Sequence, residues 1–202
     1  MKFRFYALKI CLIMIIIFII QVLFKEFTEL FVLNQSSITS YQIWRFLTAI
    51  FLHSSLPHLL YNIFALALFG SILEKFIGSK KFLLIFFFSG VLANIVAVNF
   101  YLVSLGASGA IYGILGTLAI IRPLMMVWAF GFPMPMFIAA ILWVIGGILG
   151  IFIPSNIGHI AHLSGIVVGF LAGLFLRGKR IRKKRIEIDE QEIRKWEDKY
   201  MG

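Results

Sequence analysis

A long segment of this sequence carries almost no charge. Between Phe82 and Leu176, Arg122 is the only Asp, Glu, Lys or Arg. A water-soluble domain must cover its surface with polar side chains, and a chain of 202 residues of which 61% are hydrophobic could not hide so much apolar surface in its interior. The segment instead indicates helices that are solvated by lipid. We therefore predict an all-α integral membrane protein.

Six apolar segments have the composition of membrane-spanning helices, which need about 20 residues. The first, at about 7–24, follows a basic flank as a signal peptide does, but it is long and lacks a small-residue cleavage site, so we predict a retained span. A first loop at about 25–56 mixes charges, turn formers and aromatics, which is typical of amphipathic pieces at the membrane interface. Spans two to six are predicted within 57–176, at about 57–76, 82–103, 106–121, 133–152 and 157–176.

The positive charges test this topology. We divide the chain into a membrane domain over 1–176 and a basic tail over 177–202. Because six is an even number of spans, both termini lie on one side of the membrane. That side receives seventeen of the nineteen Lys and Arg residues, because only Lys25 and Arg45 fall on the other. The positive-inside rule then predicts cytoplasmic termini, in what we expect to be the plasma membrane of a prokaryote. The charge of +10 lies in short flanks of the spans, which favours membrane lipid and disfavours nucleic acid as its partner.

The fourth predicted span opens with a serine between small residues, Gly106-Ala107-Ser108-Gly109. A helix from Ser108 to Ile121 is about 20 Å long, which is shorter than a hydrocarbon core of about 30 Å. Its N-terminus would therefore lie below the outer surface, with backbone N–H groups directed at any charge that develops there. Such an end suits a nucleophilic serine. The alternative is that Ser108 is an N-cap and the glycines only allow close packing.

Histidines in two other spans favour the interpretation of Ser108 as a nucleophile over that of a simple N-cap. His58 and Asn62 are four residues apart at the start of the second span, and both can donate a hydrogen bond. The sixth span begins with His159 and His162 and continues with glycines at four-residue spacing, which should pack it against the fourth span. An imidazole could then serve as the base for Ser108. Considered one at a time, His58 could be an ordinary interfacial residue and Asn62 a structural one, and His159 competes with His162 as the base.

The spans contain no acidic residue in their outer halves, so the predicted catalyst is a dyad without a third member. Donors for an oxyanion are available from the Ser108 N–H, His58 and Asn62. Tyr112 lies one turn below Ser108 and could pack against the histidine ring. Cys11 is the only cysteine, so one chain can form neither a disulfide nor a cysteine-based metal site. We expect no metal and no cofactor.

From Tyr41 to Gly173 the sequence resembles the rhomboid family of intramembrane serine proteases. The residues that carry the resemblance are Trp44-Arg45 and His53 in the first loop, His58 and Asn62, the G-x-S-G motif at Gly106 to Gly109, and Ala161-His162 followed by Gly165 and Gly169. The resemblance implies a six-helix bundle with a short central fourth helix. It also implies that Ser108 is the nucleophile, that His162 is the base and that Tyr112 stacks on it, with His58, Asn62 and the Ser108 N–H forming the oxyanion hole.

The expected activity is an endopeptidase that cleaves transmembrane segments of other membrane proteins, single-span proteins among them. One alternative is a rhomboid-like protein that binds membrane proteins without cleaving them. A second alternative is a small transporter whose polar pathway is lined by the same side chains. The spans contain no internal repeat, and no acidic residue lies in their outer halves, which also disfavours transport.

Overall fold

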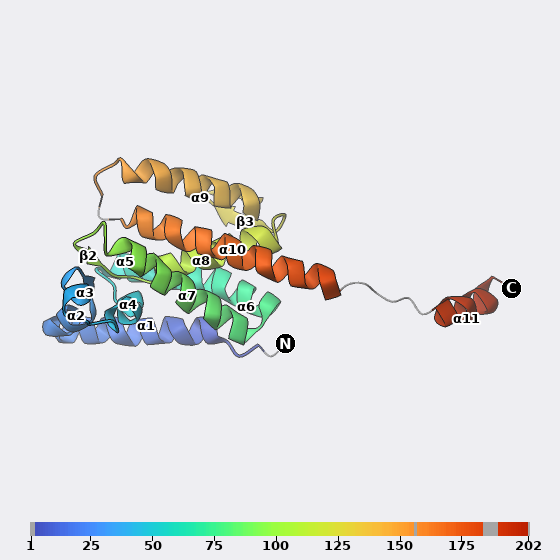
Figure 1. Ribbon diagram of the computed structural model, residues 1–202, viewed down its shortest axis with the longest axis horizontal. Helices are drawn as coiled ribbons and strands as arrows, with labels where there is room; N and C mark the ends of the chain where they lie inside the picture. The colour runs from blue at the N-terminus through green and yellow to red at the C-terminus, as the bar shows by residue number, and fades with distance from the viewer. Residues whose placement is uncertain (1–2, 156, 184–189, 202) are drawn as a thin grey trace.

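The computed structural model describes residues 3–155, 157–183 and 190–201. Its main body is a bundle of helices (Figure 1). In the described residues four helical segments are long and apolar enough to cross a membrane, namely Tyr6–Leu23, Leu56–Ile77, Ser79–Ala97 and His159–Arg177. Two shorter apolar helices accompany them, α8 (Ser108–Ile121) and α9 (Met136–Ile151). The fold is therefore an all-α membrane bundle, as the sequence predicts.

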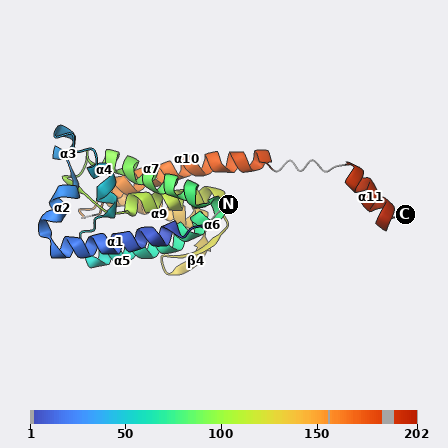
Figure 2. The same ribbon diagram turned by 90° about the horizontal axis from the view of Figure 1, so that it is seen from below.

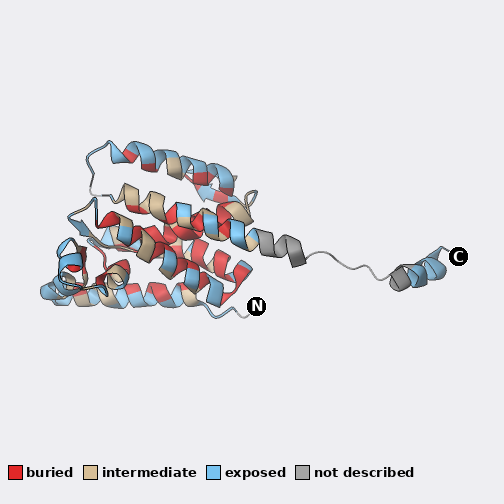
Figure 3. Cartoon of the chain, in the orientation of Figure 1, coloured by how far each residue is buried: buried red, intermediate tan, exposed pale blue. Residues whose placement is uncertain are grey.

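Helix α8 occupies the centre of the bundle. Ten of its fourteen residues are buried, and its neighbours are α5 (Leu56–Ala65), α7 (Ser79–Ala97), α9 and α10 (His159–Lys183). Figure 3 shows buried residues concentrated in the middle of the bundle, whereas exposed residues follow the outer faces of α1 (Tyr6–Leu23) and α9. Since the exposed residues of these two helices are mostly large and apolar, these faces are suited to lipid.

Glycines let α8 and α10 approach each other at backbone distance. A Cβ atom added to Gly165 would overlap the carbonyl oxygen of Gly109, and one added to Gly169 would overlap that of Gly113. The Thr117 hydroxyl bridges the same two helices, because it lies 2.9 Å from the Gly113 oxygen and 3.1 Å from the Gly169 oxygen. Such small-residue contacts pack membrane helices where the hydrophobic effect provides no driving force.

The second membrane segment is not a uniform helix. Between α5 and α6 (Ser71–Ile77) the chain forms one wide turn, η2 (Leu66–Gly70), of the π type. A Cβ atom at Gly70 would lie 2.9 Å from Leu66 Cδ1 and 3.1 Å from Ala7 Cβ, so α1 crosses very close to this turn. The glycine thus leaves room for α1 to cross close to the turn.

The first loop is a folded unit. It contains α2 (Lys25–Phe31), β1 (Leu33–Asn34), α3 (Ser36–Thr39), α4 (Arg45–Thr48) and η1 (Ala49–Phe51). Strand β1 pairs antiparallel with β2 (Val103–Ser104), which precedes α8. The Arg45 guanidinium donates to the Val32 carbonyl oxygen at 2.9 Å. Figure 2 shows α3 and α4 at one end of the bundle and α6 and β4 at the other.

Several predicted boundaries differ from the structure. Helix α7 ends at Ala97 instead of 103, because the chain turns there and forms β2. Before α9 the chain forms an unpredicted hairpin of β3 (Met126–Ala129) and β4 (Phe132–Pro135). Its two-residue turn has positive φ at Phe130 and Gly131, as tight hairpins require. Helix α10 continues to Lys183, into the segment that we expected as tail, and α11 (Glu190–Tyr200) follows.

Candidate active site

Ser108 and His162 lie in direct contact. The Ser108 Oγ and His162 Nε2 atoms are 2.7 Å apart, although 54 positions separate the two residues in the sequence. Ser108 is the first helical residue of α8, and Ala107 occupies the N-cap position. The serine side chain is therefore directed at the imidazole, which argues against a role as a simple cap.

The His162 ring is held between two helices. It stacks on the Tyr112 ring, with centroids 4.3 Å apart and planes inclined by 9°. The start of α10 is fixed by the Tyr101 hydroxyl, which accepts a hydrogen bond from the Ile160 N–H at 3.0 Å. Together with the contact between Gly165 and Gly109, these interactions fix the imidazole beside the serine.

His58 lies against Gly106, two residues before Ser108. A Cβ atom on Gly106 would lie 2.7 Å from His58 Cε1 and 2.8 Å from Nε2, so only glycine fits there. Gly106 also has a φ of +116°, which side chains rarely adopt, and its N–H donates to the Ala49 carbonyl at 2.8 Å. Asn62 is buried and donates one amide N–H to the His58 carbonyl at 3.0 Å.

The other two histidines do not reach Ser108. The His159 Nε2 atom lies 3.2 Å from the Ser155 hydroxyl, and the His159 ring packs against Gly150 of α9. The centroids of the His159 and His162 rings are 6.2 Å apart. His53 is only 2% exposed, and within the described part of the chain neither of its ring nitrogens has a partner in good hydrogen-bonding geometry. Of the two histidines on α10, the structure therefore brings His162 to the serine.

His53 lies in the first loop, with its ring centroid 5.0 Å from that of His58. Burial, with a smaller effect from the positive charge of a protonated His58, lowers the pKa of His53 from 6.5 to about 4. His53 is therefore neutral at physiological pH and acts as an apolar filler behind His58.

One polar partner of the site was missed by the sequence analysis. The Ser54 hydroxyl lies 3.1 Å from His58 Nδ1. When that hydroxyl donates to Nδ1, the proton of the neutral imidazole must be on Nε2, which is the nitrogen near Gly106. The sequence does place Ser54 four residues before His58. A serine in a loop, however, does not by itself indicate which side chain its hydroxyl contacts.

Comparison with known proteins assigns the fold. A model of the family described as Rhomboid domain matches residues 40–179, a range that contains every residue discussed at this site. The chain belongs to the rhomboid family. Among its relatives is YdcA of Bacillus subtilis, which is 34% identical over 162 residues. The rhomboid protease GluP of the same organism is 36% identical over 148 residues. The rhomboid protease GlpG of Salmonella newport is 30% identical over 157 residues.

These alignments cover 71–75% of this rhomboid but different shares of the relatives. The aligned region spans 80% of YdcA, 53% of GlpG and 28% of GluP. The aligned region is thus most of YdcA, about half of GlpG and under a third of GluP.

Proposed function

We propose that this rhomboid is a serine endopeptidase that cleaves transmembrane segments of other membrane proteins. The observation that carries the proposal is the 2.7 Å contact between Ser108 Oγ and His162 Nε2 at the N-terminus of a buried helix. A serine hydroxyl is a weak nucleophile until a neighbouring base removes its proton, and a positioned imidazole is the usual base. The alignments with the rhomboid proteases GluP and GlpG support the same reaction.

In the proposed reaction, Ser108 attacks the carbonyl carbon of the scissile peptide while His162 Nε2 accepts the hydroxyl proton. The tetrahedral oxyanion collapses to an acyl-enzyme, and His162 returns the proton to the leaving amine. A water molecule, activated by the same imidazole, then hydrolyses the acyl-enzyme. The stack with Tyr112 keeps the ring in position through both halves of the reaction.

Three donors are proposed for the oxyanion. The first is the Ser108 N–H, which lies in the first turn of α8, where backbone donors have no partner within the helix. The second is His58 Nε2–H, in the tautomer that donation from Ser54 would select. The third is Asn62, whose amide has two N–H groups, only one of which the His58 carbonyl engages.

The proposed orientation has both termini in the cytoplasm of a prokaryote. It is supported by the seventeen to two distribution of Lys and Arg and by the bacterial relatives. In that orientation Ser108 lies toward the outer surface and Arg122, at the other end of α8, toward the cytoplasm. The substrate segment would thus be cut in the outer half of the bilayer.

Labelling of the detergent-purified protein with a fluorophosphonate tests the nucleophile. Wild type and His159→Ala should react, whereas Ser108→Ala and His162→Ala should not. If Ser108→Ala still reacts, the proposed nucleophile is wrong. If the folded wild type does not react at all, the alternative of a rhomboid-like binder of membrane proteins is favoured.

A further inference from the structure

A shallow, open groove with a volume of about 670 Å³ lies along the outer face of α7. It is lined by residues that recur every three or four positions, Lys80, Leu83, Leu84, Phe87, Phe88 and Val91. The opposite face of α7 packs on α8, where Gly90 contacts Ala110 and Ala93 contacts Gly109. The groove is therefore separate from the candidate active site and faces the surroundings of the bundle.

The groove has the length of a lipid tail. From Lys80 to Val91 the helix rises about 16 Å, at about 1.5 Å per residue. Half of a hydrocarbon core of about 30 Å is about 15 Å. Apart from Lys80, all the lining residues are apolar, so the groove offers one acyl chain a continuous surface across a single leaflet.

One wall of the groove is fixed by aromatic contacts. The Phe87 ring lies 5.3 Å from the Phe86 ring and 6.2 Å from the Phe51 ring of the first loop, centroid to centroid. Phe86 is fully buried. Phe87 thus packs against two neighbouring rings, which restrict its side chain more than contact with lipid alone would.

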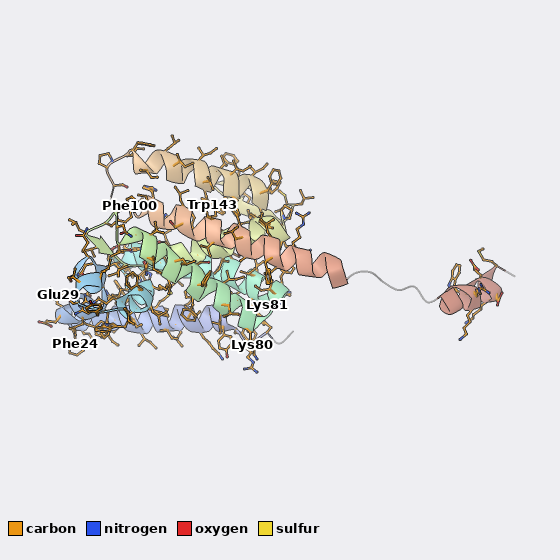
Figure 4. All side chains as sticks on the ribbon, in the orientation of Figure 1. Phe24, Glu29, Lys80, Lys81, Phe100 and Trp143 are labelled. Atoms are coloured by element: carbon orange, nitrogen blue, oxygen red, sulfur yellow. The ribbon has the colours of Figure 1, made fainter. Side chains whose placement is uncertain are left out.

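The charge at one end of the groove selects the headgroup. Among the residues that the structure describes, Lys80 is the only charged one that lines the groove, and it is exposed. Figure 4 shows Lys80 and Lys81 at the end of the bundle where α6 lies, with Glu29 at the opposite end. Lys75 belongs to the same end, so a phosphate there meets several positive charges. A lysine at the hydrocarbon boundary extends its ammonium group toward the headgroups.

We propose that this groove is a binding site for one anionic phospholipid of the leaflet at the α6 end of the bundle. One acyl chain lies along Leu84 and Phe88, and the phosphate pairs with the Lys80 ammonium. The proposal does not depend on proteolysis. Lys81 provides a matched control, because it is adjacent and exposed but does not line the groove.

Native mass spectrometry of the purified protein, titrated with phosphatidylglycerol and separately with phosphatidylcholine, tests the site. We expect one tightly retained phosphatidylglycerol. Lys80→Gln should weaken its binding about fivefold, the effect of one lysine at an anionic lipid surface, and Lys81→Gln less than twofold. Phe88→Ala should weaken the binding of both lipids, since it removes the apolar wall and leaves the charge unchanged.

Three results would overturn the proposal. The first is an equal loss of binding in Lys80→Gln and Lys81→Gln, which would indicate a diffuse basic surface. The second is unchanged binding in Phe88→Ala. The third is a wild-type protein that retains no lipid. Thermal unfolding of the three variants should match wild type, so that a binding defect is separated from a folding defect.

Discussion

The backbone of Gly165 in α10 lies directly against the carbonyl oxygen of Gly109 in α8, one residue after Ser108. This contact sets the distance between the helix that carries the serine and the helix that carries the histidine. Because the obstacle is backbone and not a flexible side chain, a methyl group at position 165 can be accommodated only if the two helices separate.

The first prediction concerns this contact. Gly165→Ala should destabilise the protein by about 1–3 kcal/mol, the usual cost of overpacking, and should abolish labelling of Ser108 even in the fraction that remains folded. The control is Gly146→Ala, because a Cβ atom there meets nothing within 4 Å. Alanine in that helix should be neutral or stabilising. Equal shifts of the unfolding midpoint in the two variants would contradict the account.

The second prediction concerns Ser54 as a positioning residue. Ser54→Ala removes the hydroxyl beside His58 Nδ1, which frees the ring to take the other tautomer. We expect kcat to fall about tenfold with little change in KM, because His58, as the proposed oxyanion donor, would act in the transition state. Ser54→Thr should restore most of the rate.

Ser55 serves as the comparison for Ser54. Its hydroxyl accepts a hydrogen bond from the His58 N–H at 3.3 Å and caps α5. Ser55→Ala should therefore lower stability by about 1 kcal/mol and leave kcat unchanged. If both alanine variants lower kcat alike, Ser54 has only a structural role.

The third prediction concerns Glu74, which is fully buried near the end of α6. Its carboxylate accepts hydrogen bonds from the N–H groups of Arg4, Tyr6 and Ala7, at 3.1–3.2 Å, and so serves as the cap of α1. Glu74→Gln should destabilise the protein by about 1–3 kcal/mol in thermal or denaturant unfolding. The exposed Glu26 should tolerate the same change, and an equal loss in Glu26→Gln would argue against the cap.

The fourth prediction concerns acid stability. Since the pKa of His53 is about 4 in the folded protein and 6.5 otherwise, the unfolded state binds a proton between these values that the folded state does not. The contribution of His53 to stability should therefore be level above about pH 6.5 and decline toward pH 4, by up to about 3 kcal/mol in all.

This decline can be assigned by comparing the free energy of unfolding at pH 7.5 and pH 4.5. In His53→Phe the difference between the two values should be smaller than in wild type, whatever the absolute stability of the variant. Phenylalanine is suitable because, among the described residues, neither ring nitrogen of His53 has a partner in good hydrogen-bonding geometry. An unchanged difference would show that His53 does not carry the effect.

Much of the bundle could be predicted because lipid imposes strong rules on a sequence. The charge-free segments fix the number of apolar helices, and the four-residue glycine spacing in the sixth span correctly predicted its contact with the fourth. The same contact explains why His162 could be placed near Ser108. The choice between His162 and His159 could not be made from spacing alone, because both lie near the start of α10 and almost on one face.

The remaining features depend on partners that are distant in sequence or on backbone geometry. The role of Glu74 requires the N–H groups of residues about seventy positions earlier, which no local pattern reveals. The second strand of the hairpin before α9 contains two prolines and is otherwise apolar. From the sequence, this segment is therefore indistinguishable from the start of the fifth span. Its turn, with Phe130 at positive φ, departs from the usual residue preference and gives no signal.

The most direct test of the central claim is cleavage of a single-span substrate in reconstituted vesicles. Wild type and His159→Ala should cut the substrate within its outer half, while Ser108→Ala and His162→Ala should leave it intact although both variants fold and bind it. Cleavage by Ser108→Ala at the rate of wild type would contradict the account, as would cleavage that requires His159 and not His162.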